Sequence, residues 1–226
     1  MSKLLKIFIG FDQKEAIAYH TFVQSLIENS TIPLSIVPLA ENNLNIYSEN
    51  HTDGTNKFTY SRFLVPYLME FKGWAIFADG DMVCVSDIKK LKDYFDPKFA
   101  VNVVKHNYKT KHKLKYFGQK NENYPRKNWS SLIIWNCSHP KNKVLTPSFI
   151  NQRDGAFLHR FKWLENKEIG SIPKTWNWLA IEYPEKKNLD IIHYTLGTPC
   201  FKQYADKSLS KFWKKSYRNL SEGLEK

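Results

Sequence analysis

The sequence predicts an α/β domain followed by a basic C-terminal helix. The chain opens with the order strand, helix, strand, which is the repeating unit of a parallel sheet. Further along, the apolar residues 74–78 are typical of a strand buried on both faces, and this strand ends in Asp79-Gly80-Asp81. The chain has 226 residues, of which 42% are hydrophobic, so it can form one domain with a sizeable core.

The opening unit places a candidate binding residue at the end of its first strand. Residues 4–11 predict that strand, a helix follows over residues 16–27, and residues 34–39 predict the second strand. Asp12 and Glu15 have the spacing of a capping box at the start of the helix. Ligands of parallel sheets bind beyond the carboxyl ends of strands, so Asp12 is either a plain N-cap or a ligand-binding residue as well.

Asp79-Gly80-Asp81 allows two interpretations. Residues i and i+2 of an extended segment point to the same side, so both carboxylates can face one point, and Gly80 allows close approach. Such a pair suits a hard divalent cation that also holds the phosphates of a substrate. An Asp-Gly pair between alternating apolar residues is equally a strong β-hairpin signal over residues 76–85. The motif alone leaves both interpretations open.

The middle of the chain predicts further elements. Residues 58–68 have the pattern of a helix that is kinked or restarted at Pro66. Arg62 precedes the apolar face of this helix and is either a surface charge or a clamp for phosphate. Ser86 is expected to cap a helix that runs to Tyr94. The remaining expectations are strands over residues 99–104 and 131–135, a helix over 155–164 and a turn over 176–180.

The last strand and the tail also carry candidate functional residues. A strand beginning at residue 189 reaches His193 and a glycine-containing loop, although a lone histidine at a strand end is more often structural than a ligand. Residues 203–226 mix lysines with aromatic residues and predict a basic amphipathic helix, which either packs on the domain or lies on a membrane surface. We therefore divide the chain into a domain over residues 1–202 and a helix over 203–226.

The charge of the chain favours an anionic partner. Lys and Arg number 34 against 22 Asp and Glu, which gives a net charge of +12 and suits nucleic acid, an acidic membrane surface or a phosphate-bearing substrate. Lysines occupy every second position from 109 to 115 within the basic and aromatic segment 105–127. This segment is interpreted as an edge hairpin whose lysines prevent pairing with other sheets, or as a surface for an acceptor or nucleic acid.

Cysteine use and hydropathy predict a cytoplasmic protein. Cys84, Cys137 and Cys200 are widely spaced and form no CxxC pair, which indicates reduced thiols. The apolar start lacks the features of a signal peptide, and no apolar run approaches the ~18 residues of a membrane span. The basic tail adds the expectation of peripheral contact with the anionic inner membrane face.

Five segments in this order resemble a bacterial branch of glycosyltransferase family 8. They are Phe-Ile-Gly-Phe-Asp at the first strand, Phe-Thr-Tyr-Ser-Arg, Ala-Asp-Gly-Asp-Met, Asn-Trp-Ser-Ser-Leu-Ile-Ile-Trp-Asn, and the late Ile-Ile-His-Tyr-Thr-Leu-Gly-Thr-Pro. The resemblance covers roughly residues 6–202, and the combination is far more specific than Asp-x-Asp alone.

The resemblance implies a GT-A fold, a Rossmann-like mixed sheet flanked by helices. It also implies a nucleoside-diphosphate sugar donor, usually UDP-linked, with Mn²⁺ or Mg²⁺ as cofactor and retention at the anomeric carbon. Asp79, Asp81 and His193 match the metal ligands of the family. The positions matched to donor binding are Phe11 and Asp12 at the nucleobase, Tyr60 and Arg62 at a helix start, Gly80 between the aspartates, and Gly197 in the loop around the diphosphate.

The chain also departs from the family pattern. Thr198 stands where the family often has a lysine, which leaves the diphosphate charge to Arg62, the metal or Lys202. The sugar-contacting strand start of the family appears here as Trp129-Ser130-Ser131. The family's Asp-Gln pair near the reacting carbon has no clear counterpart around residues 158–160, where His159 is the one catalytic candidate.

Together, these observations predict a metal-dependent retaining glycosyltransferase. It would move a hexose from a UDP-sugar to a glycan or lipid-linked acceptor, and nucleic acid is not an expected partner. A sugar-phosphate nucleotidyltransferase is one alternative, although residues 10–15 are not the glycine-rich, arginine-containing loop of that class. A nucleic-acid-binding protein is the other, although no helix-turn-helix, zinc-finger or ribonucleoprotein motif is present.

Overall fold

The centre of the fold is a six-stranded mixed sheet with helices on both faces. This computed structural model describes residues 4–52 and 56–222. The strands follow the order β2-β1-β3-β6-β5-β7, and only β6 runs antiparallel to its neighbours. Their bounds are β1 Leu5–Gly10, β2 Leu34–Leu39, β3 Trp74–Ala78, β5 Val101–Val103, β6 Leu132–Asn136 and β7 Ile169–Ser171. The predicted α/β class is confirmed, and so is the parallel strand-helix-strand unit that opens the chain.

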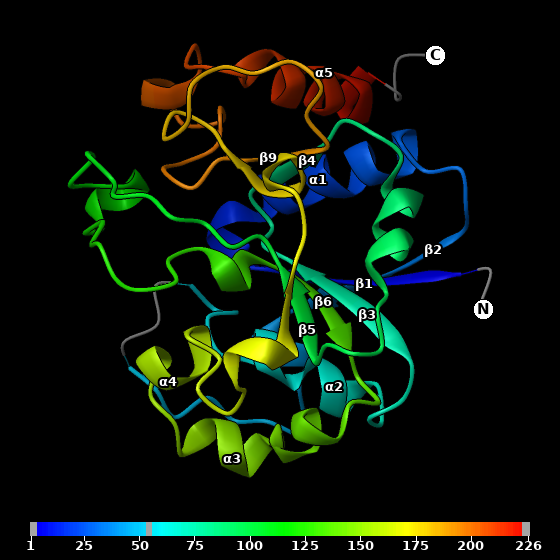
Figure 1. The fold of residues 1–226 in the computed structure, drawn as a ribbon. Helices are drawn as coiled ribbons and strands as arrows, with labels where there is room; N and C mark the ends of the chain where they lie inside the picture. Colours follow the sequence, from blue (N-terminus) through cyan, green and yellow to red (C-terminus); the bar gives the residue numbers. More distant parts are fainter. Residues whose placement is uncertain (1–3, 53–55, 223–226) are drawn as a thin grey trace.

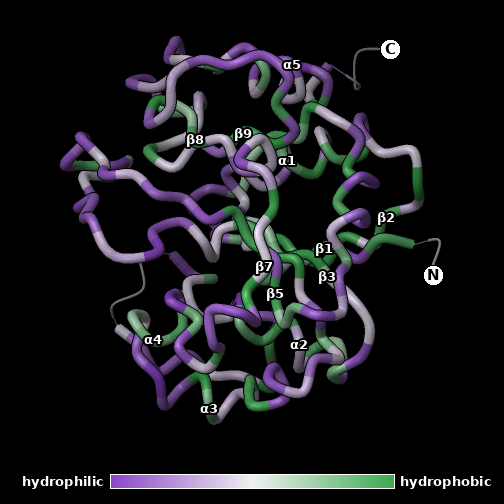
Figure 2. The backbone as a smooth tube through the Cα atoms, in the orientation of Figure 1, coloured by the Kyte–Doolittle hydropathy of each residue, from purple (hydrophilic) through white to green (hydrophobic). Residues whose placement is uncertain are grey.

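Alternating side chains of the strands build a core on each face of the sheet. Ile7 and Ile9 of β1 pack with Phe22 of α1 on one face, whereas Phe8 packs with Phe63 on the other. Figure 1 shows α1 on one side of the sheet and α2, α3 and α4 on the opposite side. The helices are α1 Ala16–Glu28, α2 Val65–Leu68, α3 Pro147–Asn151, α4 Gly155–His159 and α5 Ser210–Ser221. Figure 2 shows β1 and β3 as mainly hydrophobic, as strands covered on both faces should be.

A second, smaller sheet rules out the hairpin interpretation of the aspartate motif. It contains β4 Met82–Cys84, β9 Ile191–His193 and β8 Trp178–Leu179, and β4 pairs antiparallel with β9. β3 belongs to the main sheet instead, so the strands on either side of Asp79-Gly80-Asp81 do not pair with each other. The motif therefore connects the two sheets: β3 pairs with β1 and β6 in the main sheet, and β4 pairs with β9 in the second sheet.

The predicted capping box is wrong. Asp12 does cap the first turn, since its Oδ1 accepts a hydrogen bond from Lys14 N at 3.0 Å. Glu15 does not complete the box, because its Oε2 accepts a hydrogen bond from Tyr116 Oη at 2.6 Å. A 3-10 turn precedes α1 here and turns the Glu15 carboxyl away from the helix start.

Several other predicted elements are 3-10 helices or are shorter than expected. The helix predicted over residues 58–68 is a turn followed by the 3-10 helix Ser61–Leu64 and the short α2, and the helix predicted over 155–164 ends at His159. Asp87, and not Ser86, caps the next helix, because Asp87 Oδ1 accepts from Lys89 N at 3.0 Å. The 3-10 helices are Gln13–Glu15, Glu41–Asn43, Ser61–Leu64, Ile88–Tyr94, Tyr116–Gly118, Trp129–Ser131, Pro140–Val144, Asn166–Glu168, Lys174–Asn177 and Lys202–Tyr204.

The lysine-rich segment 105–127 is a long loop and not the predicted edge hairpin. Its strand-like pairing is limited to one isolated bridge between Leu114 and Lys120. Side chains hold the loop instead: Lys127 Nζ donates to Asn121 Oδ1 at 2.7 Å, and Asn121 Nδ2 donates to Thr110 Oγ1 at 2.9 Å. Figure 1 shows the loop reaching away from the sheet, and Figure 2 shows that it is mainly hydrophilic.

Helix α5 packs on the body of the protein through one face. Trp213 is buried in a cluster with Val83 and Ile192 of the second sheet. Ser216 Oγ donates a hydrogen bond to Glu28 Oε2 of α1 at 3.0 Å, and Figure 1 shows α5 and α1 on the same side of the molecule. No helix within the described residues combines the length and apolar character needed to cross a membrane. Residues 223–226 of the predicted tail lie outside the described part.

Candidate functional site

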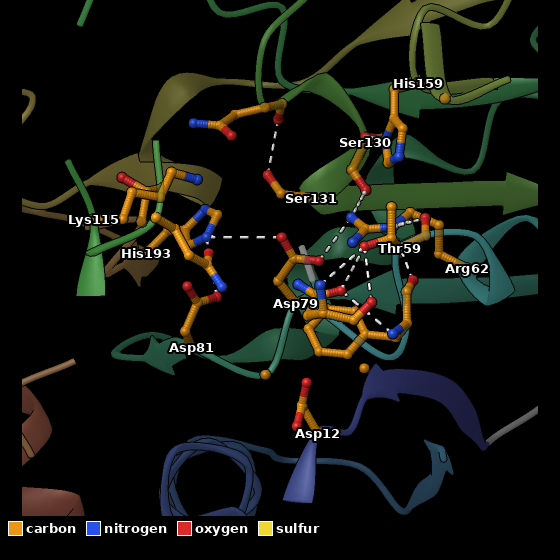
Figure 3. A pocket seen from close by; sticks show the side chains of 18 of the residues that line it. Asp12, Thr59, Arg62, Asp79, Asp81, Lys115, Ser130, Ser131, His159 and His193 are labelled. Carbon is orange, nitrogen blue, oxygen red and sulfur yellow. Dashed lines mark hydrogen bonds and ion pairs between the residues drawn. The ribbon is translucent and has the colours of Figure 1, made fainter. Parts of the chain in front are cut away.

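Asp79, Asp81 and His193 meet where the two sheets join. The aspartates follow the carboxyl end of β3, and His193 is the last residue of β9, whose pairing with β4 places it opposite Met82. One ligand atom from each of the three side chains lies within 4.8 Å of the others, so the group could hold a metal ion. Figure 3 shows the two carboxylates and the imidazole pointing toward one another.

Gly80 is required because the backbone of β1 passes close to the motif. A Cβ atom at Gly80 would lie 2.5 Å from the carbonyl oxygen of Gly10, which is the last residue of β1. Backbone hydrogen bonds hold the flanking residues: Asp79 N donates to Ser131 O, and Tyr194 N donates to Asp81 O, both at 2.9 Å. The two carboxylates are therefore set by the crossing of the sheets and not by a local turn.

Asn177 determines which nitrogen of His193 faces the aspartates. Ser131 Oγ donates its proton to Asn128 O at 2.8 Å, so it can only accept from Asn177 Nδ2, also at 2.8 Å. The Asn177 amide oxygen then faces His193 Nδ1 at 2.9 Å, and Nδ1 must carry the proton. His193 Nε2 is then the nitrogen that faces the aspartates, 3.1 Å from Asp81 Oδ1, the arrangement of a metal-ligating imidazole oriented by a neighbouring group.

Arg62 holds the first aspartate from behind. Its side chain is buried, and Nη1 lies 2.8 Å from Asp79 Oδ1 and 2.9 Å from Ser130 O. Nε donates to Thr59 O at 3.1 Å, and the guanidinium lies 4.8 Å from the ring centroid of Phe77. Arg62 is thus not a surface charge, since it is buried and paired with a carboxylate, and its role as a clamp for phosphate stays a prediction.

The electrostatics of the aspartates fit a cation. Burial raises the pKa of Asp79 to about 6, although Arg62 opposes this shift. Burial acts in the same direction on Asp81, but the charge and hydrogen bonding of His193, together with the charge of Lys115, hold the pKa of that carboxyl below its usual range. Asp79 Oδ1 is buried beside Arg62 Nη1, and Asp81 Oδ1 is buried beside His193 Nε2. Two buried carboxylates held this close together favour a cation between them.

A cavity of about 440 Å³ opens beside this group. Nine of the thirteen residues predicted for the site line it: Asp12, Tyr60, Arg62, Asp79, Gly80, Asp81, Ser130, His159 and His193. The wall also contains Lys115, Tyr116 and Glu122 from the lysine-rich loop. The long gaps between these residues in the sequence show that the cavity is assembled from most of the chain.

Four predicted residues lie outside the lining of the cavity. Phe11 packs edge-to-face against Tyr19, with ring centroids 5.3 Å apart. Trp129 is partly buried, and its Nε1 donates to His106 O at 2.8 Å. Gly197 has φ of +143° and is enclosed by Tyr204 and Tyr116, whose side chains would meet a Cβ there. Lys202 is exposed in the 3-10 helix Lys202–Tyr204.

His159 enters the cavity as a neutral imidazole. Its Nδ1 lies 2.7 Å from Ser130 Oγ, and Figure 3 shows the two side chains side by side. Burial, with the nearby charge of Arg62, lowers the pKa of His159 to about 3. The ring can exchange hydrogen bonds with a ligand but does not supply a positive charge near neutral pH.

Glu15 lines the cavity, although the sequence analysis interpreted it only as part of a helix capping box. Burial raises its pKa to about 8, and the charge of Asp81 adds to the effect. Oε2 accepts from Tyr116 Oη at 2.6 Å, while Oε1 is buried without a hydrogen-bond donor among the described residues. Sequence reasoning also missed Lys115 and Asn177. Neither residue carries a local signal, because the groups that each one faces are distant in sequence. Lys115 acts on Asp81, 34 positions earlier, and Asn177 faces His193, 16 positions later on β9.

Comparison with solved structures identifies the fold. The bifunctional glycosyltransferase WbbM in its apo form superposes with a TM-score of 0.65 and 16% identity, and the match covers 100% of this chain and 51% of WbbM. The galactosyltransferase LgtC, solved with donor and acceptor sugar analogues, gives a TM-score of 0.55 and 9% identity over 96% of both chains. The fold is therefore GT-A, as the sequence predicted, whereas the particular bacterial branch of family 8 stays a prediction.

Comparison of sequences identifies the relatives. No family model matches the chain. A curated protein of Arabidopsis thaliana, Protein CDI, is 40% identical over 220 residues, which amount to 93% of this chain and 85% of the relative. Identity of this degree along nearly the whole length of both proteins indicates common descent and a shared fold. The chain belongs to the family of Protein CDI.

Proposed function

We propose that the chain is a metal-dependent retaining glycosyltransferase. It transfers a hexose from a nucleoside-diphosphate sugar, with UDP as the nucleotide, to a glycan or lipid-linked acceptor. The observation that carries the proposal is the convergence of Asp79, Asp81 and His193 at the carboxyl end of the central strand β3, beside a cavity of about 440 Å³ in a GT-A fold. Ligands of open α/β sheets bind at this edge.

Mn²⁺ or Mg²⁺ would be held by the two carboxylates and the imidazole. When bound, the cation would neutralise the charge that develops on the diphosphate leaving group. Two oxygens and one nitrogen form a mixed ligand set that suits Mn²⁺ better than Ca²⁺. Asn177 keeps the Nε2 lone pair of His193 directed at the site, and Arg62 limits the repulsion between Asp79 and Asp81 until the cation is present.

The donor would extend from the metal group along the cavity. Asp12 lies just beyond β1 and would hold the nucleobase, while Gly80 leaves room for the diphosphate near the aspartates. Ser130 and His159 would contact the sugar, because their hydrogen-bonded pair lines the wall next to the Arg62–Asp79 ion pair. Tyr60 lines the same wall. Phe11, Trp129 and Gly197 lie outside the lining and would support it from behind. Lys202 would contact the donor only if its segment moved toward the cavity.

Retention would follow a same-face course in which the leaving diphosphate helps to deprotonate the acceptor hydroxyl. His159, neutral at physiological pH, would orient a sugar hydroxyl and would not act as a nucleophile. The cavity carboxylates Asp12, Glu15 and Glu122 are the alternatives for a covalent course. Mass spectrometry of the protein after incubation with an activated fluorosugar distinguishes the two, and a glycosyl adduct on a carboxylate would exclude the same-face course.

Calorimetric titration of nucleotides is the direct test. UDP, GDP and CMP would be titrated into the protein with and without Mn²⁺, and into Asp81→Asn. We expect UDP to bind only with the metal and the variant to lose this binding. Asp206→Asn is the control, because Asp206 is exposed and remote from the cavity lining. Absence of any metal-dependent nucleotide binding in the unaltered protein would refute the proposal.

The same preparation tests the two alternative functions. A sugar-phosphate nucleotidyltransferase would release pyrophosphate from a nucleoside triphosphate in the presence of a sugar phosphate. A nucleic-acid-binding protein would bind random oligonucleotides with a steep dependence on salt. We expect neither result, because residues 10–15 are not the glycine-rich loop of a nucleotidyltransferase, and binding of random oligonucleotides would not require the Asp79, Asp81 and His193 group.

Helix α5 would place the enzyme on the cytoplasmic side of an anionic membrane. Lys211, Lys215 and Arg218 are exposed on the helix, while Trp213 is buried against the protein. Deleting the helix would expose that core, so the test is the charge variant K211Q/K215Q/R218Q in a co-sedimentation assay with phosphatidylserine vesicles. Equal sedimentation of the variant and the unaltered protein would refute membrane contact through α5.

A further inference from the structure

The proposed donor brings more negative charge into the cavity than the metal group can balance. A divalent cation is already neutralised by Asp79 and Asp81, and a nucleoside diphosphate adds at least two further charges. Among the described residues, the cationic side chains that line the cavity are Arg62, Lys115 and Arg160. A positive group that is close to the aspartates and free of other partners is therefore needed.

Arg62 does not meet this need. Its guanidinium is enclosed by Asp79 Oδ1 at 2.8 Å, Ser130 O at 2.9 Å and Thr59 O at 3.1 Å. An anion could reach it only by displacing the Asp79 carboxylate, which is itself a candidate metal ligand. Its charge also serves to offset that carboxylate, so little remains for a second anion.

The loop after β9 offers no cation either. Thr198 is fully buried, and its Oγ1 lies 2.9 Å from Cys200 Sγ. Lys202 is exposed and does not line the cavity. Arg160 also lines the cavity, as the C-cap residue of α4 directly after His159, which pairs with Ser130.

Lys115 has the required position. It comes from the loop 105–127, lines the cavity, and lies beside His193 in Figure 3. The positive charge of Lys115 reaches both carboxylates of the metal group, Asp79 and Asp81. Its Nζ makes no ion pair or hydrogen bond within the described part of the chain, so the ammonium group is available to a ligand.

The neighbouring residue fixes where Lys115 points. Tyr116 is buried, its Oη donates to Glu15 Oε2 at 2.6 Å, and its N donates to Leu196 O at 2.8 Å. Lys115 N donates to Gln119 O at 2.8 Å and closes the turn on the other side. A lysine next to such an anchor loses less backbone freedom on binding an anion than one on an unattached loop.

We propose that Lys115 is the diphosphate-binding cation of this protein. Its ammonium group donates to the phosphate oxygens of the donor and neutralises the departing diphosphate from the side opposite Arg62. The lysine-rich loop thereby supplies the charge that Thr198 and Lys202 do not. This inference rests on the proposed function, because it assigns a residue to the same nucleotide site.

Binding of nucleotides with different numbers of phosphates tests the inference. UDP, UMP and uridine would be titrated with Mn²⁺ into the unaltered protein and into Lys115→Met, with GDP and guanosine as a parallel pair. Lys115→Met removes a charge-assisted contact, so we expect it to weaken UDP binding roughly 10- to 100-fold. Uridine binding should not change, and Lys115→Arg should recover part of the UDP affinity.

Lys111→Met is the matched control, since Lys111 is exposed in the same loop and does not line the cavity. It should bind UDP as the unaltered protein does, and thermal melts should coincide for all variants. Equal loss of UDP and uridine affinity in Lys115→Met, or no loss of either, would refute the role of Lys115 while leaving the glycosyltransferase proposal intact. Failure of the unaltered protein to bind any of these nucleotides would refute both.

Discussion

Replacement of Glu15 by glutamine should change how the stability of the protein depends on pH. Burial raises the pKa of this carboxyl from 4.5 to about 8, so the folded protein keeps a proton there that the unfolded chain releases. Glutamine has the same size, can still accept the hydrogen bond from Tyr116 Oη, and cannot ionise. The difference between the two proteins therefore isolates the titration of one side chain.

The sign and size of the effect follow from proton linkage. A carboxyl whose folded pKa is raised contributes its full stability below the unfolded pKa, and this stability is lost as the pH rises toward the folded pKa. The window for Glu15 thus runs from pH 4.5 to about 8. At about 1.36 kcal/mol per pKa unit the loss would approach 5 kcal/mol. Water in the cavity screens part of it, so we expect roughly 2 to 4 kcal/mol.

Urea unfolding at pH 5 and pH 8 with a chelator present measures this loss. The unaltered protein and Glu15→Gln should have similar free energies of unfolding at pH 5, whereas at pH 8 the variant should be the more stable of the two. Glu70→Gln is the control, because Glu70 is exposed and forms an ion pair with exposed Lys72. Parallel pH profiles for the unaltered protein and Glu15→Gln would refute the buried, protonated state of Glu15.

Three further substitutions test the site and its supports. Asn177→Ala should weaken Mn²⁺ binding about 10- to 100-fold in calorimetry without loss of fold, because the ligating imidazole loses its orienting partner; an unchanged affinity would argue against that partner. Gly80→Ala should cost more than about 2 kcal/mol in urea unfolding, since its Cβ would lie 2.5 Å from Gly10 O. Gly118→Ala should cost about 1 kcal/mol, because its φ of +69° disfavours alanine but no atom clashes with the new Cβ. Trp213→Ala should cost about 3 to 5 kcal/mol and exposed Tyr217→Ala far less, and equal losses would show that α5 is not packed as described.

Local patterns in the sequence predicted five of the six strands of the main sheet and the position of its binding edge, but not β7. The apolar run before Asp79 is typical of a buried strand, and the opening strand-helix-strand unit is typical of a parallel sheet. Side chains at i and i+2 of an extended segment share a side, so the two aspartates were expected to face one point. The strands and the shared direction of the two aspartates depend on residues that are close in sequence, so they can be predicted from the sequence alone.

Only the tertiary structure decided which of several compatible local interpretations holds. An Asp-Gly pair permits a hairpin, but β3 and β4 pair with strands much further along the chain and separate into two sheets. Glu15 has the spacing of a helix cap, yet Tyr116 from the lysine-rich loop takes its carboxyl. The sequence position of Arg62 was compatible with exposure to solvent or with phosphate binding, and in the structure its guanidinium forms an ion pair with Asp79. In each case the winning partner is distant in sequence, so burial and charge pairing in the folded state, and not local propensity, set the outcome.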